Sequence, residues 1–144
     1  MASWNRLQRA LTSSGAATAP DTLDRRLRGR TYAVPFDEVW QCALRLADGG
    51  LRGWCLLEAD DVEGILHGTQ RGLLRRAERP VTVRIGFDAD AQTRVDLEIA
   101  SAQGGGPDLG AAARAIHRFT AALDRELHRR RRATARPAPI RLDT

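Results

Sequence analysis

The chain has 144 residues, 42% of them hydrophobic, which suffices for one small domain with a buried core. It lacks an apolar run of the roughly 18 residues needed to span a bilayer, and it lacks the apolar stretch of a secretion signal. We therefore expect a cytoplasmic protein that contacts a membrane, if at all, only at its surface. A net charge of +5 favours anionic partners, but every basic residue is an arginine, and so uniform a bias weakens the arginine count as a functional signal.

The first 30 residues form a basic peripheral segment. SWNRLQRAL at 3–11 has the spacing of a short helix with Trp4, Leu7 and Leu11 on one face, and TSSGAATAP at 12–20 has the composition of a flexible linker. Two interpretations stay open for this segment: it docks on a membrane or partner, or it is a frayed terminus.

The predicted domain covers residues 31–128. TYAV at 31–34 reads as a short strand, and FDEVWQCALRLADGG at 36–50 as a helix that Gly49 and Gly50 end. Next come two strands around a tight acidic turn, GWCLLEADD and VEGILHGTQRG, with Asp60 and Asp61 serving the turn. Cys42 and Cys55 are too few for a disulfide framework, and we expect two buried free thiols.

The clearest strand pair is PVTVRIGF at 80–87 and TRVDLEIAS at 93–101. In both strands apolar residues alternate with polar ones, and the loop DADAQ between them has hairpin length. This pairing predicts antiparallel neighbours, with Arg84 near Asp96 on a charged face opposite the apolar face.

A long helix follows, with Leu109, Ile116, Phe119 and Leu123 in its apolar stripe and Arg114, Arg118 and Arg125 on its other side. The order β-α-β-β-β-β-α predicts an α+β two-layer sandwich: an antiparallel sheet of about five strands with two helices on one face. Residues 129–144 form a basic, proline-containing tail. Its run Arg129, Arg130, Arg131 and Arg132 is either an electrostatic contact for phosphates or acidic lipids, or a solvated helix end.

The stretch GGGPDLG at 104–110 raises the question of a phosphate-binding loop. Asp108 places a negative charge where the phosphate would lie, and neither a G-K-S/T sequence nor a parallel crossover is present. We therefore interpret Gly106, Pro107 and Asp108 as a corner that starts the helix.

The spacing of histidine and serine residues does not favour a metal site or a nucleophilic active site. His67, His117 and His128 show neither H-x-x-x-H nor E-x-x-H spacing, and Ser101 lacks the G-x-S-x-G context of a nucleophile. We predict no catalytic, cofactor or metal residue and no cofactor, and we expect the protein not to be an enzyme.

The domain resembles the bacterial domain-of-unknown-function family numbered fourteen ninety-nine, between about Tyr32 and Leu127. The resemblance is carried by FDEVW, by Gly53-Trp54, by VTVRI and TRVDL, and by D-L-G at Asp108 before R-x-I-x-x-F. This chain departs from the family pattern in EIASAQGGG, which lacks the family's Ser- and Arg-rich character, and in Ala112, where the family carries asparagine. The resemblance implies a fold and a bacterial origin, and no reaction.

A looser similarity is to helix-grip domains, which enclose a ligand pocket between a curved sheet and a long C-terminal helix. Seven residues either line such a pocket or fill the core: Trp40, Trp54, Ile65, Val83, Leu97, Ile116 and Phe119. The leading hypothesis is a non-enzymatic binding or accessory module whose basic termini contact an acidic protein partner or a membrane surface. The alternative is a carrier of a small apolar ligand, and nucleic acid is a weakly supported partner because the basic tail has no aromatic platform.

Overall fold

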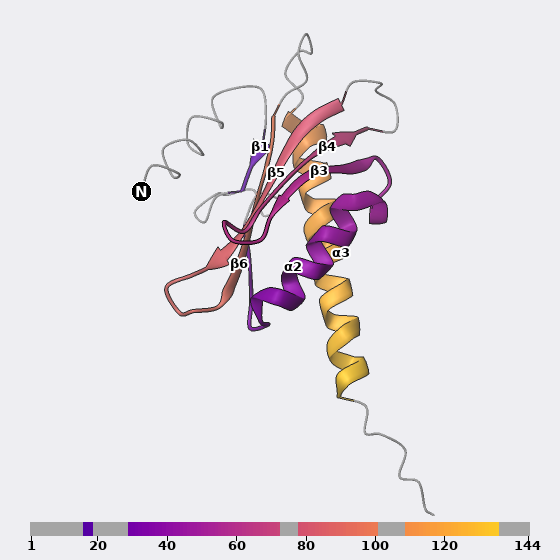
Figure 1. Ribbon diagram of the computed structural model, residues 1–144. Coiled ribbons are helices and arrows are strands. Elements are labelled where there is room, and N and C mark those ends of the chain that lie inside the picture. The colour runs from indigo at the N-terminus through magenta and orange to yellow at the C-terminus, as the bar shows by residue number, and fades with distance from the viewer. Residues whose placement is uncertain (1–15, 19–28, 73–77, 101–108, 136–144) are drawn as a thin grey trace, which may run out of the picture.

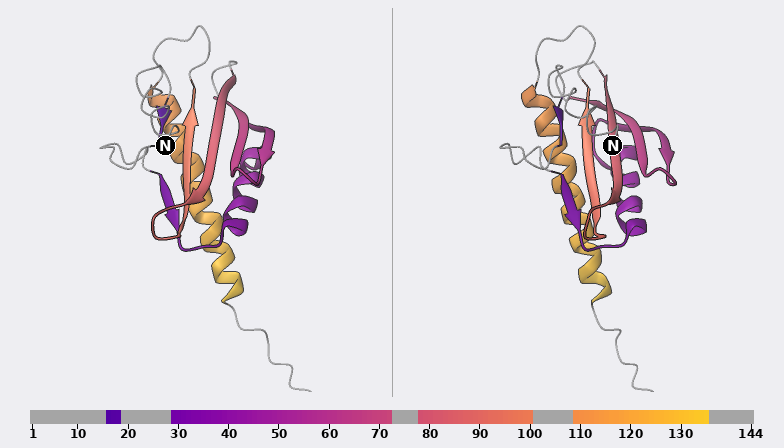
Figure 2. Two further views of the ribbon diagram at one scale, coloured as in Figure 1. Left: turned by 60° about the vertical axis from the view of Figure 1, so that its left-hand side comes forward. Right: turned by 90° about the vertical axis from the view of Figure 1, so that its left-hand side faces the viewer.

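The computed structural model describes residues 16–18, 29–72, 78–100 and 109–135. It confirms the α+β class: an antiparallel sheet with two helices packed on one face (Figures 1 and 2). The elements are, in chain order, β1 (Ala16–Ala17), β2 (Arg30–Tyr32), α2 (Phe36–Arg45), η2 (Leu46–Gly50), β3 (Trp54–Asp60), β4 (Ile65–Arg71), β5 (Glu78–Phe87), β6 (Thr93–Ile99) and α3 (Leu109–Thr134).

The strand order is β1-β6-β5-β4-β3, and β2 also pairs with β6. Ala16 is the partner of Ile99, whereas Tyr32 is the partner of Thr93, so β1 and β2 follow one another along the same edge of β6. The sheet therefore contains six described strands but is five strands wide.

Strand β1 corrects the interpretation of residues 12–20 as a linker, which is wrong at 16–18. Thr18 is 1% exposed; its amide donates to the Leu97 carbonyl at 2.8 Å, and its hydroxyl accepts a bond from the Leu97 amide at 3.0 Å. The same hydroxyl donates to the Asp96 carboxylate at 2.9 Å. Two alanines carry no hydrophobic alternation, so the sequence offered no strand signal there.

The hairpin prediction is confirmed. In the register of β5 and β6, Val83 is the partner of Leu97 and Arg84 is the partner of Asp96, and residues 88–92 form the loop. Asp96 forms its ion pair with Arg94, however, at 2.8 Å from Nε, and this hydrogen bond raises the pKa of Arg94. The charged face is half-buried at Arg84, Arg94, Asp96 and Glu98.

The core lies between the other sheet face and the two helices. Val83, Leu97, Ile116, Phe119 and Leu123 are each at most 1% exposed. At about 25 cal/mol per Å² of apolar area, burying side chains of this size is the main favourable contribution to folding. Helix α2 ends in a π-helical turn, η2, where Gly49 has a φ of 88° that a side chain would strain.

Three described features differ from the sequence expectations. The strand β2 stops at Tyr32, since the chain bends at Ala33 and Val34 before Pro35. Helix α3 continues to Thr134, so the arginine run assigned to the tail is helical. Cys42 is buried as expected, but Cys55 is exposed because it lies on the solvent side of the edge strand β3.

Candidate binding surface

The solvent face of α3 carries a line of arginines. Arg114, Arg118, Arg125, Arg129 and Arg132 are all exposed. At 100° per residue their positions fall within an arc of about 60°, and at 1.5 Å per residue the line is about 27 Å long. We call these five residues the arginine face. Helix α3 lies along the outside of the molecule, and its last turns project beyond the sheet (Figures 1 and 2).

The two carboxylates of α3, Asp124 and Glu126, lie to either side of the arginine face, and Glu126 forms an ion pair with one of its members, Arg129. Asp124 accepts a hydrogen bond from the Tyr32 hydroxyl and forms an ion pair with Arg30, with 3.6 Å between Nε and Oδ2. Burial and the neighbouring Asp124 raise the pKa of Tyr32, so this hydroxyl keeps its proton. The arginine face therefore contains no acidic residue.

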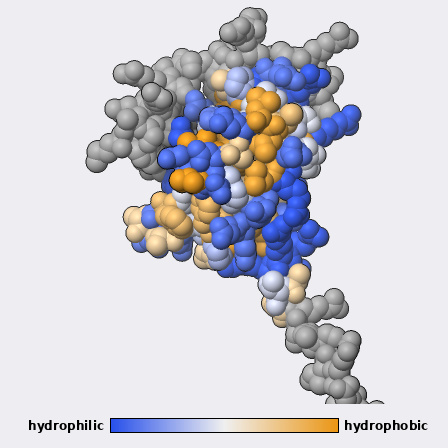
Figure 3. All heavy atoms as spheres, in the orientation of Figure 1, coloured by the Kyte–Doolittle hydropathy of each residue, from blue (hydrophilic) through white to orange (hydrophobic). Residues whose placement is uncertain are grey.

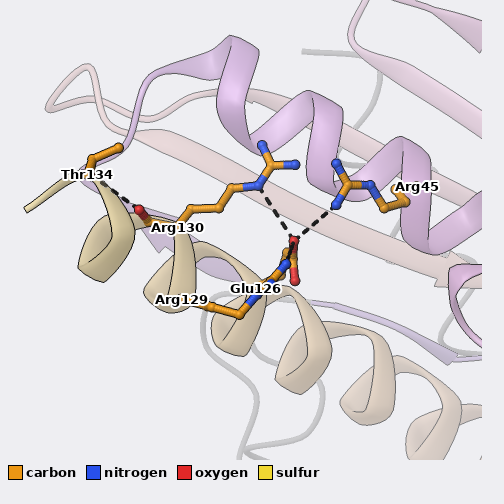
Figure 4. A network of polar contacts seen from close by, with 5 residues as sticks. All are labelled: Arg45, Glu126, Arg129, Arg130 and Thr134. Atoms are coloured by element: carbon orange, nitrogen blue, oxygen red, sulfur yellow. Dashed lines mark hydrogen bonds and ion pairs between the residues drawn. The ribbon is translucent and has the colours of Figure 1, made fainter. Parts of the chain in front are cut away.

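Glu126, the second carboxylate, is the centre of a network that joins α3 to α2 (Figure 4). Its Oε1 lies 3.1 Å from Nη1 of Arg45, 2.8 Å from Nη2 of Arg129 and 3.6 Å from Nε of Arg130. The hydrogen bond from Arg129 lowers the pKa of Glu126 below its ordinary value, and the charges of Arg45 and Arg130 act in the same direction. One carboxylate thus offsets part of the charge of three arginines.

The predicted run Arg129 to Arg132 is consequently divided in its roles. Arg129 and Arg130 contact Glu126, and Arg131 donates a hydrogen bond to the Ala33 carbonyl, which fixes the end of α3 beside the connection from β2 to α2. Arg132 has no ion pair within the described residues. The run thus has contacts within the domain that neither sequence interpretation expected, and its contact with phosphates or acidic lipids stays a prediction.

No ion pair between described residues involves Arg114, Arg118 or Arg125. The apolar stripe predicts these three arginines on the opposite side of the helix, and Arg129 and Arg132 continue the same line. The spacings of 4, 7, 4 and 3 residues were the available signal.

The seven residues predicted to line a pocket or fill the core are mostly core. Six of them are buried in one cluster, and Ile65 is half-buried. The rings of Trp54 and Phe119 lie 4.9 Å apart between their centres, and Trp40 stacks on Phe36 at 5.7 Å. These contacts fit a packed core, and the carrier of an apolar ligand stays a prediction. Gly106, Pro107 and Asp108 lie outside the described residues.

The described histidine and cysteine side chains outside the arginine face do not form a reactive group. His67 Nδ1 lies 3.3 Å from the Thr82 hydroxyl on the exposed sheet face. Burial raises the pKa of the Cys42 thiol, which disfavours the reactive thiolate. Within the described ranges no three His, Cys, Asp or Glu side chains gather as metal ligands, and no described helix is long and apolar enough to cross a membrane.

Neither a protein-family model nor a curated protein matches this chain. The resemblance drawn from the sequence motifs therefore stays an expectation.

Proposed function

We propose that this protein is a non-enzymatic binding module that contacts an anionic membrane surface through the arginine face of α3. The observation that carries the proposal is the alignment of five exposed arginines on one side of a helix, with no acidic residue among them. The other side of α3 is buried in the core, so the charged side faces outward.

The shape of the arginine face favours a membrane over nucleic acid. The line is straight, its neighbours Ala111 and Ala121 are small, and it contains no Phe, Tyr or Trp on which an unpaired base would stack. A straight row of guanidinium groups can reach many headgroup phosphates of a flat surface at once. In the view of Figure 3, hydrophilic residues cover the lower right of the molecule, where α2 and the second half of α3 lie.

The expected affinity is modest. Each basic residue near an anionic leaflet contributes about 1 kcal/mol, so five correspond to about 5 kcal/mol and a dissociation constant of about 0.2 mM in accessible lipid. Binding of this kind is reversible, and it falls steeply as salt screens the charges.

The test is sedimentation with vesicles of phosphatidylserine and phosphatidylcholine, compared with pure phosphatidylcholine, across a salt series. The variant R114Q/R118Q/R125Q removes three charges outside the Glu126 network, and we expect about 100-fold weaker binding. The matched control R52Q/R71Q/R84Q has the same net charge and should bind within about threefold of the wild type, because its changes lie on other surfaces.

Equal loss in both variants would mean that only net charge matters and would contradict the proposal. So would a wild type that ignores anionic vesicles at low salt, or that binds RNA in a parallel assay and not vesicles.

A further inference from the structure

One end of the sheet is acidic and apolar at once. The connections from β2 to α2, from β3 to β4 and from β5 to β6 all lie at this end, as the antiparallel order requires. Val62 is 88% exposed and Phe87 68% exposed, and Phe87 contacts the half-buried Phe36 with 6.0 Å between ring centres. Large apolar side chains exposed at one end of a domain commonly mark an interaction surface.

Acidic residues surround these side chains. We call the acidic end the set of Phe36, Val62 and Phe87 with seven carboxylates: Asp37, Glu38, Asp60, Asp61, Glu63, Asp88 and Asp90. The segments 33–38, 57–64 and 87–92, which hold them, contain no arginine. No ion pair between described residues involves any of the seven, although the charge of Asp88 attracts Arg94.

The two turns of the acidic end have fixed backbones. Asp60 accepts hydrogen bonds from the amides of Val62 and Glu63 at 3.1 Å, and Asp88 accepts from the amides of Asp90 and Gln92 at 2.9 Å. A Cβ at Gly64 would lie 2.1 Å from the carbonyl of Ile85, so glycine permits this close approach, and the Ile85 amide donates to the Gly64 carbonyl at 2.7 Å. A surface held in this way loses little conformational entropy on binding.

We infer that the acidic end binds the arginine face of a second copy of this chain. Carboxylates would pair with guanidinium groups, and the rings of Phe36 and Phe87 offer faces on which arginine stacks. The inference rests on the same arginine face as the proposed function. Because acidic ends repel one another, the contact joins two different surfaces, and it is head-to-tail.

The consequence is competition. A copy whose arginine face lies on an anionic membrane cannot offer that face to an acidic end, so lipid and self-association exclude one another at each arginine face. Anionic vesicles should therefore dissociate the assemblies, and neutral vesicles should not.

The experiment uses two neutralised variants of the full chain. D61N/E63Q/D90N alters the acidic end but spares the turn residues Asp60 and Asp88, and R114Q/R118Q/R125Q alters the arginine face. In analytical ultracentrifugation at low salt, the mass of the wild type should rise with concentration, whereas each variant alone should need at least about 30-fold higher concentration. An equimolar mixture should form one-to-one dimers that grow no further, because it retains one intact surface of each kind.

A wild type that stays monomeric at millimolar concentration would overturn the inference and leave the acidic end to another occupant, such as a basic partner segment. Failure of the mixture to form dimers would also overturn it, once circular dichroism shows both variants folded. The D61N/E63Q/D90N variant should bind anionic vesicles as the wild type does, so loss of vesicle binding and loss of self-association are separable outcomes. F87S provides a second test of the acidic end that alters no charge.

Discussion

The two sides of α3 differ in what a substitution should do. On the buried side, Ile116, Phe119 and Leu123 are 0% exposed and hold the helix on the sheet. On the other side Arg114, Arg118 and Arg125 are exposed and have no ion pair within the described residues. The same helix therefore carries stability on one side and, as we propose, binding on the other, so the two properties should be separable by mutation.

The largest effect is expected on the buried side. Phe119→Ala removes a fully buried ring that contacts Trp54, and the free energy of unfolding should fall by about 3–5 kcal/mol. Denaturant unfolding followed by tryptophan fluorescence measures this change. A loss below about 1 kcal/mol would show that the helix is not held by its apolar side.

A buried polar group should also carry stability. Thr18→Val leaves the Leu97 amide without the hydroxyl acceptor and removes one donor to Asp96, so we expect a loss of about 1–3 kcal/mol. The matched control Thr31→Val lies at an exposed position of β2 and should change stability by no more than about 0.5 kcal/mol. Equal stability of the Thr18→Val variant and the wild type would mean that β1 does not contribute to the fold.

Glu126 lies between the two cases, because it is partly buried and contacts three arginines. Glu126→Gln should lower stability by about 1 kcal/mol at neutral pH. The folded-state pKa is lowered, so this contribution is present above the ordinary glutamate pKa and is lost as the pH falls through the lowered value. The unfolding temperatures of the two proteins, measured between pH 7 and pH 3, should therefore become equal at the lowest pH. A difference independent of pH would contradict the ionic origin.

The smallest change in stability is expected on the arginine face itself. Arg118→Gln should alter the free energy of unfolding by no more than about 0.5 kcal/mol, because the side chain is exposed. The same protein should bind anionic vesicles about fivefold more weakly. Destabilisation of more than 1 kcal/mol would show that the two sides of α3 are not independent.

Much of the fold follows from periodicity. The alternation in VTVRI and TRVDL predicted both the hairpin and the pairing of Arg84 with Asp96, because a single register buries every apolar residue. Strand β1 was not predicted because it depends on hydrogen bonds between Thr18 and β6, and a run of small residues gives no sequence pattern that indicates such bonds.

The candidate surfaces were partly within reach of the sequence. The arginine face follows from helical spacing once α3 is known to continue to Thr134. The acidic end joins segments about 50 residues apart in the chain, such as Phe36 and Phe87, and only the sheet topology brings them together. A sequence pattern records spacing along one element, whereas a surface made of several connections depends on tertiary structure.

The hydrogen bond from Arg131 to the Ala33 carbonyl limits how far the end of α3 can move relative to the domain. It fixes the far end of the helix to the chain just before α2, while the buried side chains fix the rest. A pull on the arginine face would thus be transmitted to the domain as a whole, with no hinge between the charged surface and the core. The helix and the domain would therefore move as one rigid body.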